Sequence, residues 1–136
     1  MALQSAIINV MKQAARKASV RLKRDYGEVD QLQVSQKGPS DFVTAADIRT
    51  ERILKEELTR ARPNFGFLME EAGEVKGHNP NCRWIVDPID GTTNFVHGIA
   101  HFAICIALEE SGQITAGVIL DPINEQLFWA EKGQGA

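Results

Sequence analysis

The chain has 136 residues, enough for one ordinary domain and too few for two. Its 43% apolar and 24% charged residues exclude a disordered or collagen-like chain, and its formal net charge of -3 argues against a general nucleic-acid-binding protein. The longest apolar run, residues 102–108, is too short to cross a bilayer. We therefore expect neither a membrane nor a nucleic acid as a partner.

The two cysteines, Cys82 and Cys105, are too few for the disulfide framework of a small secreted protein and favour the cytoplasm as the location. Residues 1–24 carry six basic side chains and no acidic one, a composition that mitochondrial transit peptides share. Their apolar residues follow helical spacing, however, which favours a helix packed on a core. This apolar stripe consists of Ile7, Val10, Met11, Ala14, Ala15, Ala18 and Leu22.

The same spacing predicts a first helix over about Leu3 to Lys23 that stops before Gly27. Residues 33–42 contain a Gly-Pro-Ser sequence, which is typical of a loop or a short hairpin. These two features predict that the first interruption of helical structure lies between residues 27 and 42.

A second helix is predicted to begin near Thr44, whose hydroxyl can cap the amide of Asp47, and to end at Pro63. After Pro63 the apolar period changes to that of strands, rich in β-branched and aromatic residues. The turns between the last three strands are too short for crossover helices, so these strands should form an antiparallel meander. We expect an α+β fold in which two helices pack on an antiparallel sheet. The predicted strands are residues 65–69, 83–87, 101–108, 114–120 and 126–131.

The most informative segment is RWIVDPIDGTTNFVHG, residues 83–98. A short apolar strand leads into Asp87, and Pro88 removes an amide from the ladder and turns the chain. The carboxylates of Asp87 and Asp90 can then converge on one point, with the carbonyl of Ile89 between them. Such a cluster of hard oxygens is what Mg²⁺ prefers.

Gly91 lets the backbone approach a ligand closely, and the amides of Gly91 and Thr92 would point at an anion if they open a helix. Bound dications beside these amides would make a site for a phosphate group. The alternative is a surface Asp-Gly turn with a helix cap. The acidic elements elsewhere in the chain favour the phosphate site.

The first of these elements is the pair Glu70 and Glu71, which ends a strongly apolar strand. Adjacent carboxylates repel each other unless something offsets their charge, and neighbouring strand residues point to opposite faces. We therefore expect one of the two to face the site, the alternative being a solvated strand end. The second element is Thr44 with Asp47, whose alternative role is a favourable charge at a helix start.

Three basic or imidazole side chains are further candidates for the site. Lys37 can pair with a phosphate or an acid, although a lone lysine is usually solvent-facing. His97 and His101 suggest a softer metal, but they lack an obvious third partner. The oxygen donors therefore define the expected site.

Taken together, these segments resemble the signatures of the inositol monophosphatase family, the Mg²⁺-dependent, lithium-sensitive sugar and inositol phosphatases. WIVDPIDGTTNFVHG is similar to the family's W-I-x-D-P-I-D-G-T-x-N-F signature, EEAG to its E-E element, and DFVTAAD to its D-x-V-T-x-x-D element. They occur in family order, and residues 117–136 resemble the strand pair that follows. The resemblance implies the N-terminal part of a layered α/β/α/β/α sugar-phosphatase fold over residues 1–136.

The resemblance also implies the metal ligands. Glu70, Asp87 and the Ile89 carbonyl would bind a first Mg²⁺, and Asp87 would bridge to a second ion that Asp90 also binds. Family members continue into a second α/β part with a W-D-x-A segment, whose Asp completes the second site. No such segment is present in residues 1–136, so we expect this chain to be the N-terminal portion.

The catalytic roles follow from the same resemblance. Thr92 and Asp47 would be hydrogen-bonded to each other and, with Glu70, would position the attacking water and help deprotonate it. Gly91 and Thr92 would hold the substrate phosphate through their amides, and Asp90 would also face a substrate hydroxyl. Lys37 matches a family lysine near the metal site.

The implied reaction is hydrolysis of myo-inositol monophosphate, a small phosphorylated polyol, by a cytoplasmic homodimer. Close relatives in the family hydrolyse fructose 1,6-bisphosphate, 3′-phosphoadenosine phosphates or histidinol phosphate, and the motifs do not separate these substrates. Some bacterial members also join transcription antitermination complexes through surfaces outside the catalytic site. This binding role is the alternative from a different functional class.

Overall fold

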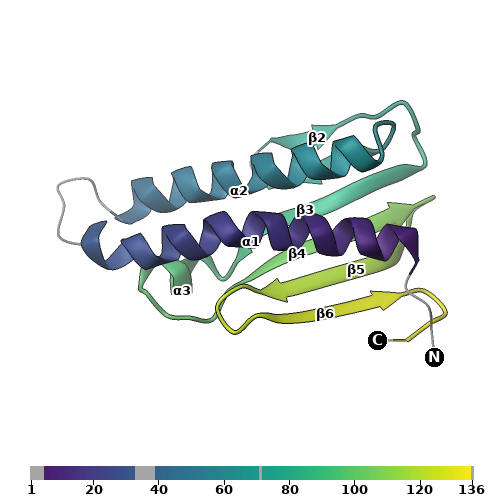
Figure 1. The fold of residues 1–136 in the computed structure, drawn as a ribbon. Helices are drawn as coiled ribbons and strands as arrows, with labels where there is room; N and C mark the ends of the chain where they lie inside the picture. Colours follow the sequence, from purple (N-terminus) through teal and green to yellow (C-terminus); the bar gives the residue numbers. More distant parts are fainter. Residues whose placement is uncertain (1–4, 33–38, 71, 136) are drawn as a thin grey trace.

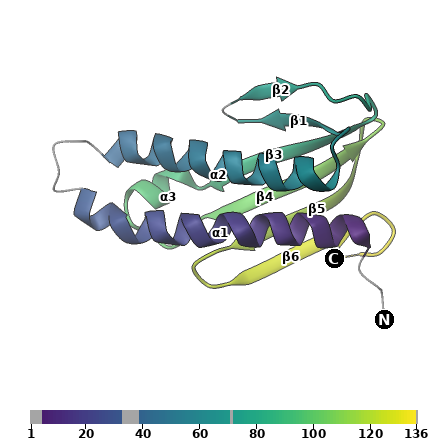
Figure 2. The ribbon, with the colours of Figure 1, turned by 45° about the horizontal axis from the view of Figure 1, so that its top comes forward.

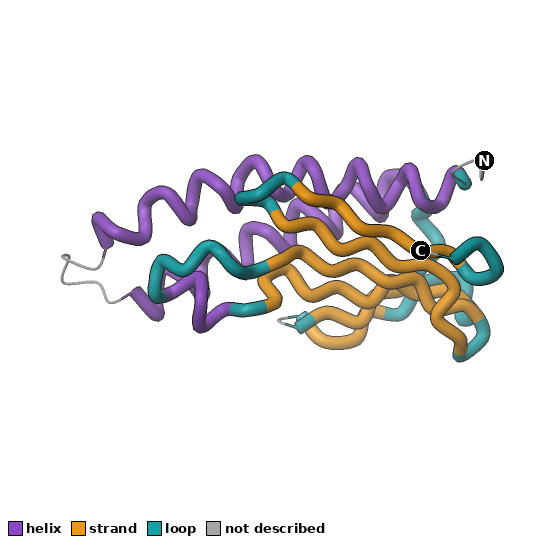
Figure 3. The backbone as a smooth tube through the Cα atoms, turned by 90° about the horizontal axis from the view of Figure 1, so that it is seen from below, coloured by secondary structure: helices purple, strands orange, loops and turns teal. Residues whose placement is uncertain are grey.

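The computed structural model describes residues 5–32, 39–70 and 72–135. Two long helices lie side by side over one face of a six-stranded sheet, and a short helix lies at one end of it (Figure 1, Figure 2). Figure 3 views the sheet from its other face, where the strands lie in front of the helices. The α+β class is confirmed.

The helices are α1 (Ala6–Leu32), α2 (Pro39–Ala61) and α3 (Thr92–Val96). The strands are β1 (Gly66–Met69), β2 (Gly73–Val75), β3 (Cys82–Asp90), β4 (Ala103–Glu110), β5 (Gln113–Asp121) and β6 (Gln126–Glu131).

Helix α1 runs to Leu32, so the predicted stop before Gly27 is wrong. Glycine inside a helix costs about 1 kcal/mol relative to alanine, and contacts of the residues just before Gly27 offset that cost. Asp25, which is 1% exposed, forms ion pairs with Arg21 and Arg49 and accepts a hydrogen bond from Arg21. The contacts of Tyr26 also hold the helix beyond the predicted end.

Tyr26 joins α1 to the short helix α3. Its hydroxyl donates a hydrogen bond to the carbonyl of Gly98 at 2.6 Å, and its ring lies 5.8 Å from Phe95 and 5.1 Å from Phe102, centroid to centroid. Phe95 and Phe102 meet edge to face at 5.0 Å. Aromatic pairs in this range add about 0.5–1.5 kcal/mol each beyond their buried area. The last turns of α1 therefore fix the position of α3.

Helix α2 begins at Pro39, five residues before the predicted start near Thr44. Proline suits the first helical position because its missing N–H would have no partner there. Thr44 consequently lies inside the helix, so the predicted cap is wrong, as is the loop over 39–42. The rest of that predicted loop, with Lys37, lies outside the described residues. The helix ends at Ala61, two residues before Pro63, close to the predicted end.

The sheet has the order β2-β1-β3-β4-β5-β6. Strands β4 to β6 form the predicted antiparallel meander, and β3, which is longer than expected, extends it by pairing antiparallel with β4. Strand β1 pairs parallel with β3, however, so the sheet is mixed and not wholly antiparallel. The parallel pair arises because the three-residue strand β2, which the sequence did not reveal, returns the chain beside β1.

The core fills the space between the two long helices and the sheet. Alternate residues of β4, namely Ile104, Ile106 and Leu108, point to the helices and are at most 1% exposed. Trp84 of β3 is fully buried among them. Burying such a side chain contributes about 1.5–3 kcal/mol. The opposite sheet face carries exposed apolar residues at Ile119 and Phe128.

Among the described residues, no helix is both long enough and apolar enough to cross a membrane.

We predict that Asp25→Ala lowers the free energy of unfolding by about 2 kcal/mol, because it leaves Arg21 and Arg49 without their buried anion. Removing one partner of a fully buried pair costs more, but both arginines are partly exposed and can hydrate. Urea unfolding followed by circular dichroism measures the change. The exposed Glu28, on the same helix, gives the control Glu28→Ala, expected to change stability by less than about 0.5 kcal/mol. Equal effects of the two substitutions would contradict the prediction.

Candidate active site

Glu70 directly follows β1, and Asp87 lies inside the parallel strand β3, where β1 ends opposite Val86. Because Met69 is in register with Val86, the next residues of the two chains, Glu70 and Asp87, start about one strand spacing apart, roughly 4.8 Å between the two backbones. Side chains alternate along a strand. Glu70 and Asp87 therefore continue the rows that face away from the helices.

Asp87 and Asp90 lie on either side of an irregularity in the β3–β4 ladder. The Cα of Asp87 is opposite Cys105 and that of Asp90 is opposite Ala103, with a register shift between them. The predicted turn at Pro88 is wrong: β3 continues through Pro88 to Asp90, and the proline, which supplies no amide, lies where the ladder to β4 shifts register.

Both carboxylates act on the same thiol. Burial raises the pKa of Cys105 to about 11, with further contributions from the negative charges of Asp90 and Asp87. Asp87 and Asp90 are thus both near Cys105. Their convergence on one point stays a prediction.

One oxygen of Asp87, Oδ1, is buried and has no hydrogen-bond partner among the residues that the structure describes. A buried carboxylate oxygen costs free energy unless a cation or a donor offsets its charge. Mg²⁺ is commonly held by one or two carboxylates together with several waters. Within the described residues, no three His, Cys, Asp or Glu side chains form a group that could hold a metal ion, but the two carboxylates and a carbonyl fit the Mg²⁺ pattern.

The carbonyl between the two acids is held by Thr92. The hydroxyl of Thr92 donates a hydrogen bond to the carbonyl oxygen of Ile89 at 3.0 Å. A carbonyl oxygen has two lone pairs, so the hydrogen bond from Thr92 does not by itself prevent a cation from binding there. The predicted hydrogen bond between Thr92 and Asp47 stays a prediction.

Gly91 connects β3 to α3 in a left-handed conformation with φ of 98°. A Cβ at this position would lie 3.0 Å from the carbonyl oxygen of His101 and 3.3 Å from Phe102, so a side chain would be strained and crowded. The amides of Gly91 and Thr92 are expected to point at an anion if these residues open a helix. Helix α3 does begin at Thr92, so this condition is met. The side chain of Asn94 holds the facing loop by donating to the His101 carbonyl at 2.8 Å.

Helix α2 contributes a buried polar face on the other side of the sheet. Asp47 is 6% exposed, Thr50 is fully buried and Glu51 is 5% exposed. Glu51 accepts a hydrogen bond from the amide of Ala72 at 3.4 Å, which ties α2 to the turn after Glu70. The sequence analysis overlooked Glu51, although its spacing of four residues from Asp47 was a usable signal.

A polar groove of about 340 Å³ opens beside Asp90, and sequence reasoning also missed it. It lies between the β3–α3 connection and the end of β5, where His101 and Asp121 contribute to its wall. A second, mostly apolar groove of about 450 Å³ runs over the open sheet face and includes Asp87 and Cys105. The acids thus stand where a polar and an apolar surface meet.

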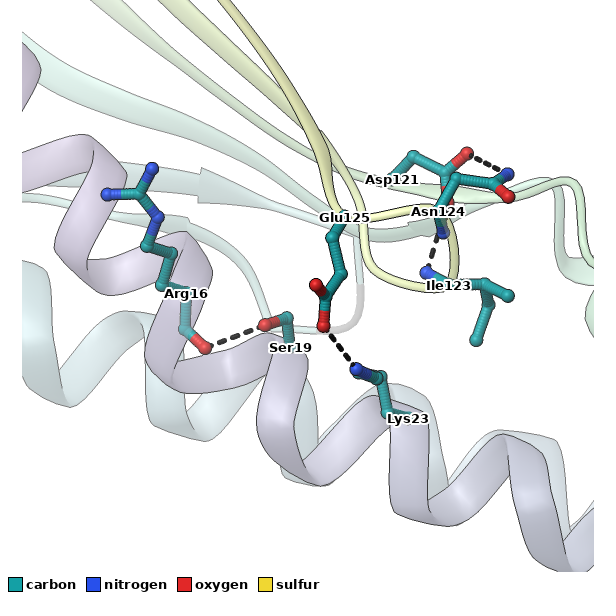
Figure 4. A network of polar contacts seen from close by, with 7 residues as sticks. All are labelled: Arg16, Ser19, Lys23, Asp121, Ile123, Asn124 and Glu125. Atoms are coloured by element: carbon teal, nitrogen blue, oxygen red, sulfur yellow. Dashed lines mark hydrogen bonds and ion pairs between the residues drawn. The ribbon is translucent and has the colours of Figure 1, made fainter.

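Asp121 is fixed by the turn that follows β5 (Figure 4). Its Oδ1 accepts hydrogen bonds from the amides of Ile123 and Asn124, and its Oδ2 accepts one from the Asn124 side chain. Partial burial on its own would raise the pKa of Asp121, but these bonds and the charge of His101 lower it below its ordinary value. The ionised carboxylate therefore organises this wall of the groove.

The sequence profile of the inositol monophosphatase family matches residues 3–136, and the chain belongs to this family. An inositol-1-monophosphatase of Rhizobium meliloti (strain 1021) is 56% identical over 133 residues, covering 98% of this chain and 50% of that protein. The Nus factor SuhB of Escherichia coli (strain K12) is 38% identical over 130 residues, covering 96% of this chain and 49% of that protein. The chain therefore spans about half the length of the curated relatives it matches.

The fold agrees with this assignment. The crystal structure of extragenic suppressor protein SuhB from Bartonella henselae superposes with a TM-score of 0.86 at 54% sequence identity, covering 96% of this chain and 50% of that one. The α+β arrangement of helices on one side of a mixed sheet is thus the arrangement of the first half of a family member.

We predict that Asp121→Ala lowers the free energy of unfolding at pH 7 by about 1–2 kcal/mol, because the turn loses an anion that accepts three hydrogen bonds. Since the folded pKa lies below the unfolded value of about 3.9, this contribution is present above that value and is lost as the pH falls through the folded pKa. Urea unfolding at pH 7 and at pH 2.5 measures the difference.

The neighbouring Glu125 provides the control for this experiment. It is exposed and pairs across the surface with Lys23 at 2.7 Å (Figure 4), so Glu125→Gln should change stability little at either pH. A loss in Asp121→Ala that is as large at pH 2.5 as at pH 7 would contradict the prediction.

Proposed function

We propose that the protein carrying this chain is a Mg²⁺-dependent phosphomonoesterase whose substrate is myo-inositol monophosphate. The observation that carries the proposal is the parallel register of β1 with β3, in which Met69 is paired with Val86, so that Glu70 and Asp87 follow a matched pair of residues. Membership of the inositol monophosphatase family supports it, as does the name of the Rhizobium meliloti relative, inositol-1-monophosphatase.

Glu70, Asp87, Asp90 and the carbonyl of Ile89 would hold the metal. Phosphate-monoester hydrolysis is among the slowest uncatalysed reactions, so the phosphoryl charge must be offset and a strong nucleophile supplied. Bound Mg²⁺ supplies positive charge to the phosphoryl oxygens and makes a nearby water more acidic. The buried Oδ1 of Asp87 fits a ligand role, because it lacks a hydrogen-bond partner within the described chain.

The remaining residues would handle the proton and the substrate. Asp47 and Thr92, with Glu70, would orient the attacking water and accept its proton, a general-base role suited to a carboxylate. The amides of Gly91 and Thr92 would bind the phosphate, and Asp90 would accept a hydrogen bond from a substrate hydroxyl. Lys37 would lie near the metal, although it is outside the described residues.

Two further expectations belong to this proposal. The resemblance that defines the substrate also implies a homodimer as the assembly. The two free cysteines, Cys82 and Cys105, agree with a reducing cytoplasm as the location.

We expect Asp87→Asn and Asp90→Asn, in the complete protein that carries this chain, each to reduce phosphate release from inositol 1-phosphate at low Mg²⁺ by at least about 100-fold. Loss of an outer-shell partner of a metal costs about 10–100-fold, and loss of a ligand should cost at least as much. The matched control is Glu74→Gln, an exposed acid on β2, expected to keep wild-type activity. Wild-type activity in Asp90→Asn at low Mg²⁺ would overturn the metal assignment.

A substrate panel addresses the other phosphatases of the family. Fructose 1,6-bisphosphate, 3′-phosphoadenosine phosphate and histidinol phosphate are each compared with inositol 1-phosphate by kcat/KM. Preference for any of the three would replace the proposed substrate while leaving the metal site intact.

A second candidate function is membership of a transcription antitermination complex. The relatives named Nus factor SuhB favour it, and the exposed basic side chains of α1 offer a surface. Two of these side chains already pair within the chain, Lys17 with Glu57 and Lys23 with Glu125. A solvated helix face therefore accounts for this surface without a partner.

We expect the phosphatase role alone, so that Asp87→Asn fails to rescue a strain in which the gene is deleted. Copurification with RNA polymerase at modest salt provides a direct readout, and we expect none. Rescue by the inactive variant together with copurification would establish the binding role instead.

A further inference from the structure

We propose that Glu51 of α2 is a positioning residue, whose carboxylate holds the turn between β1 and β2 so that Glu70 faces the metal site. The inference rests on the proposed function, because it concerns the ligand Glu70. Neither the sequence motifs nor the resemblance assigned a role to Glu51.

The contact that carries the inference runs between two elements. Oε1 of Glu51 accepts a hydrogen bond from the amide of Ala72 at 3.4 Å, and Ala72 follows Glu70 by two residues. The side chain of Glu51 comes from a long, well-packed helix, whereas the turn joins strands of four and three residues. The helix is therefore the rigid partner in this contact, and the turn is the part that it fixes.

Burying the carboxylate of Glu51 costs free energy unless favourable contacts offset that cost. Glu51 is 5% exposed and lies one helical turn after Asp47, which is 6% exposed. Like charges four residues apart on a helix repel each other, and a buried carboxylate costs more than an apolar side chain of the same size. The hydrogen bond from a backbone amide to an ionised acceptor offsets part of this cost and is stronger than a neutral one.

The geometry of the hairpin explains why a small shift in the turn would reach the metal site. Met69 of β1 is paired with Gly73 of β2, so Glu70 and Ala72 lie in a tight connection between the paired strands. Mg²⁺ demands nearly ideal octahedral geometry, so moving the turn would move Glu70 out of reach of a cation held at Asp87. Groups that orient metal ligands in this way typically contribute 10–100-fold to affinity.

The test separates reach from charge with three substitutions in the complete protein. Glu51→Ala removes the acceptor, Glu51→Asp keeps the charge but withdraws it by one methylene, and Glu51→Gln keeps an acceptor at the same reach without the charge. The dissociation constant for Mg²⁺, measured by isothermal titration calorimetry without substrate, is the main readout. Thermal unfolding without Mg²⁺ reports any loss of stability separately.

We expect Glu51→Ala and Glu51→Asp to weaken Mg²⁺ binding by about 10–100-fold, and Glu51→Gln to stay within about threefold of wild type, since a neutral hydrogen bond retains roughly half the strength. Glu56→Ala removes an exposed acid from the same helix and should leave binding unchanged. In activity assays, raising Mg²⁺ should restore the kcat of Glu51→Asp, which a loss of folded protein would not allow.

Three outcomes would overturn the inference. A lower melting temperature with unchanged Mg²⁺ affinity in Glu51→Ala would make Glu51 merely structural. Equal weakening in Glu51→Gln and Glu51→Ala would mean that its charge acts on the metal directly. Absence of Mg²⁺ binding and of hydrolysis in the wild type would overturn the proposed function itself, a failure distinct from the other two.

Discussion

The parallel pairing of β1 with β3 is the constraint on which the site depends. It gives the two strands the same direction, and the register of Met69 with Val86 sets the backbone of Glu70 next to that of Asp87. An antiparallel pairing would have sent these acids to opposite edges. The short return strand β2 allows this direction, because it leads the chain away from β1 before β3 enters beside it.

The two faces of the sheet carry different groups of residues near the end of β1. Helices α1 and α2 cover one face, where Asp47 and Glu51 are buried beside the core. The rows that contain Asp87 and Cys105 belong to the other face. Only beyond the strand ends can side chains from the two faces approach one another, so acids from α2 and from β3 can act together there.

Sequence reasoning succeeded where the signal was local. The apolar alternation predicted the meander of β4 to β6, because this pattern depends on neighbouring residues; the convergence of Asp87 and Asp90 stays a prediction. It failed where distant contacts decide: α1 passes Gly27 because Tyr26 is held by α3. The strand β2 has no apolar run of its own, and Glu51 acquires its contact only when α2 meets the hairpin.

Helix α1, near the start of the chain, packs on β5, which comes late in the sequence. Lys23 of α1 contacts Glu125, which lies 102 positions later in the sequence. At synthesis rates of about 5–20 residues per second, roughly 5–20 s separate the appearance of α1 from that of its support. During that interval the face of the helix that packs on β5 has no sheet to cover it, so apolar surface is exposed before the fold is complete.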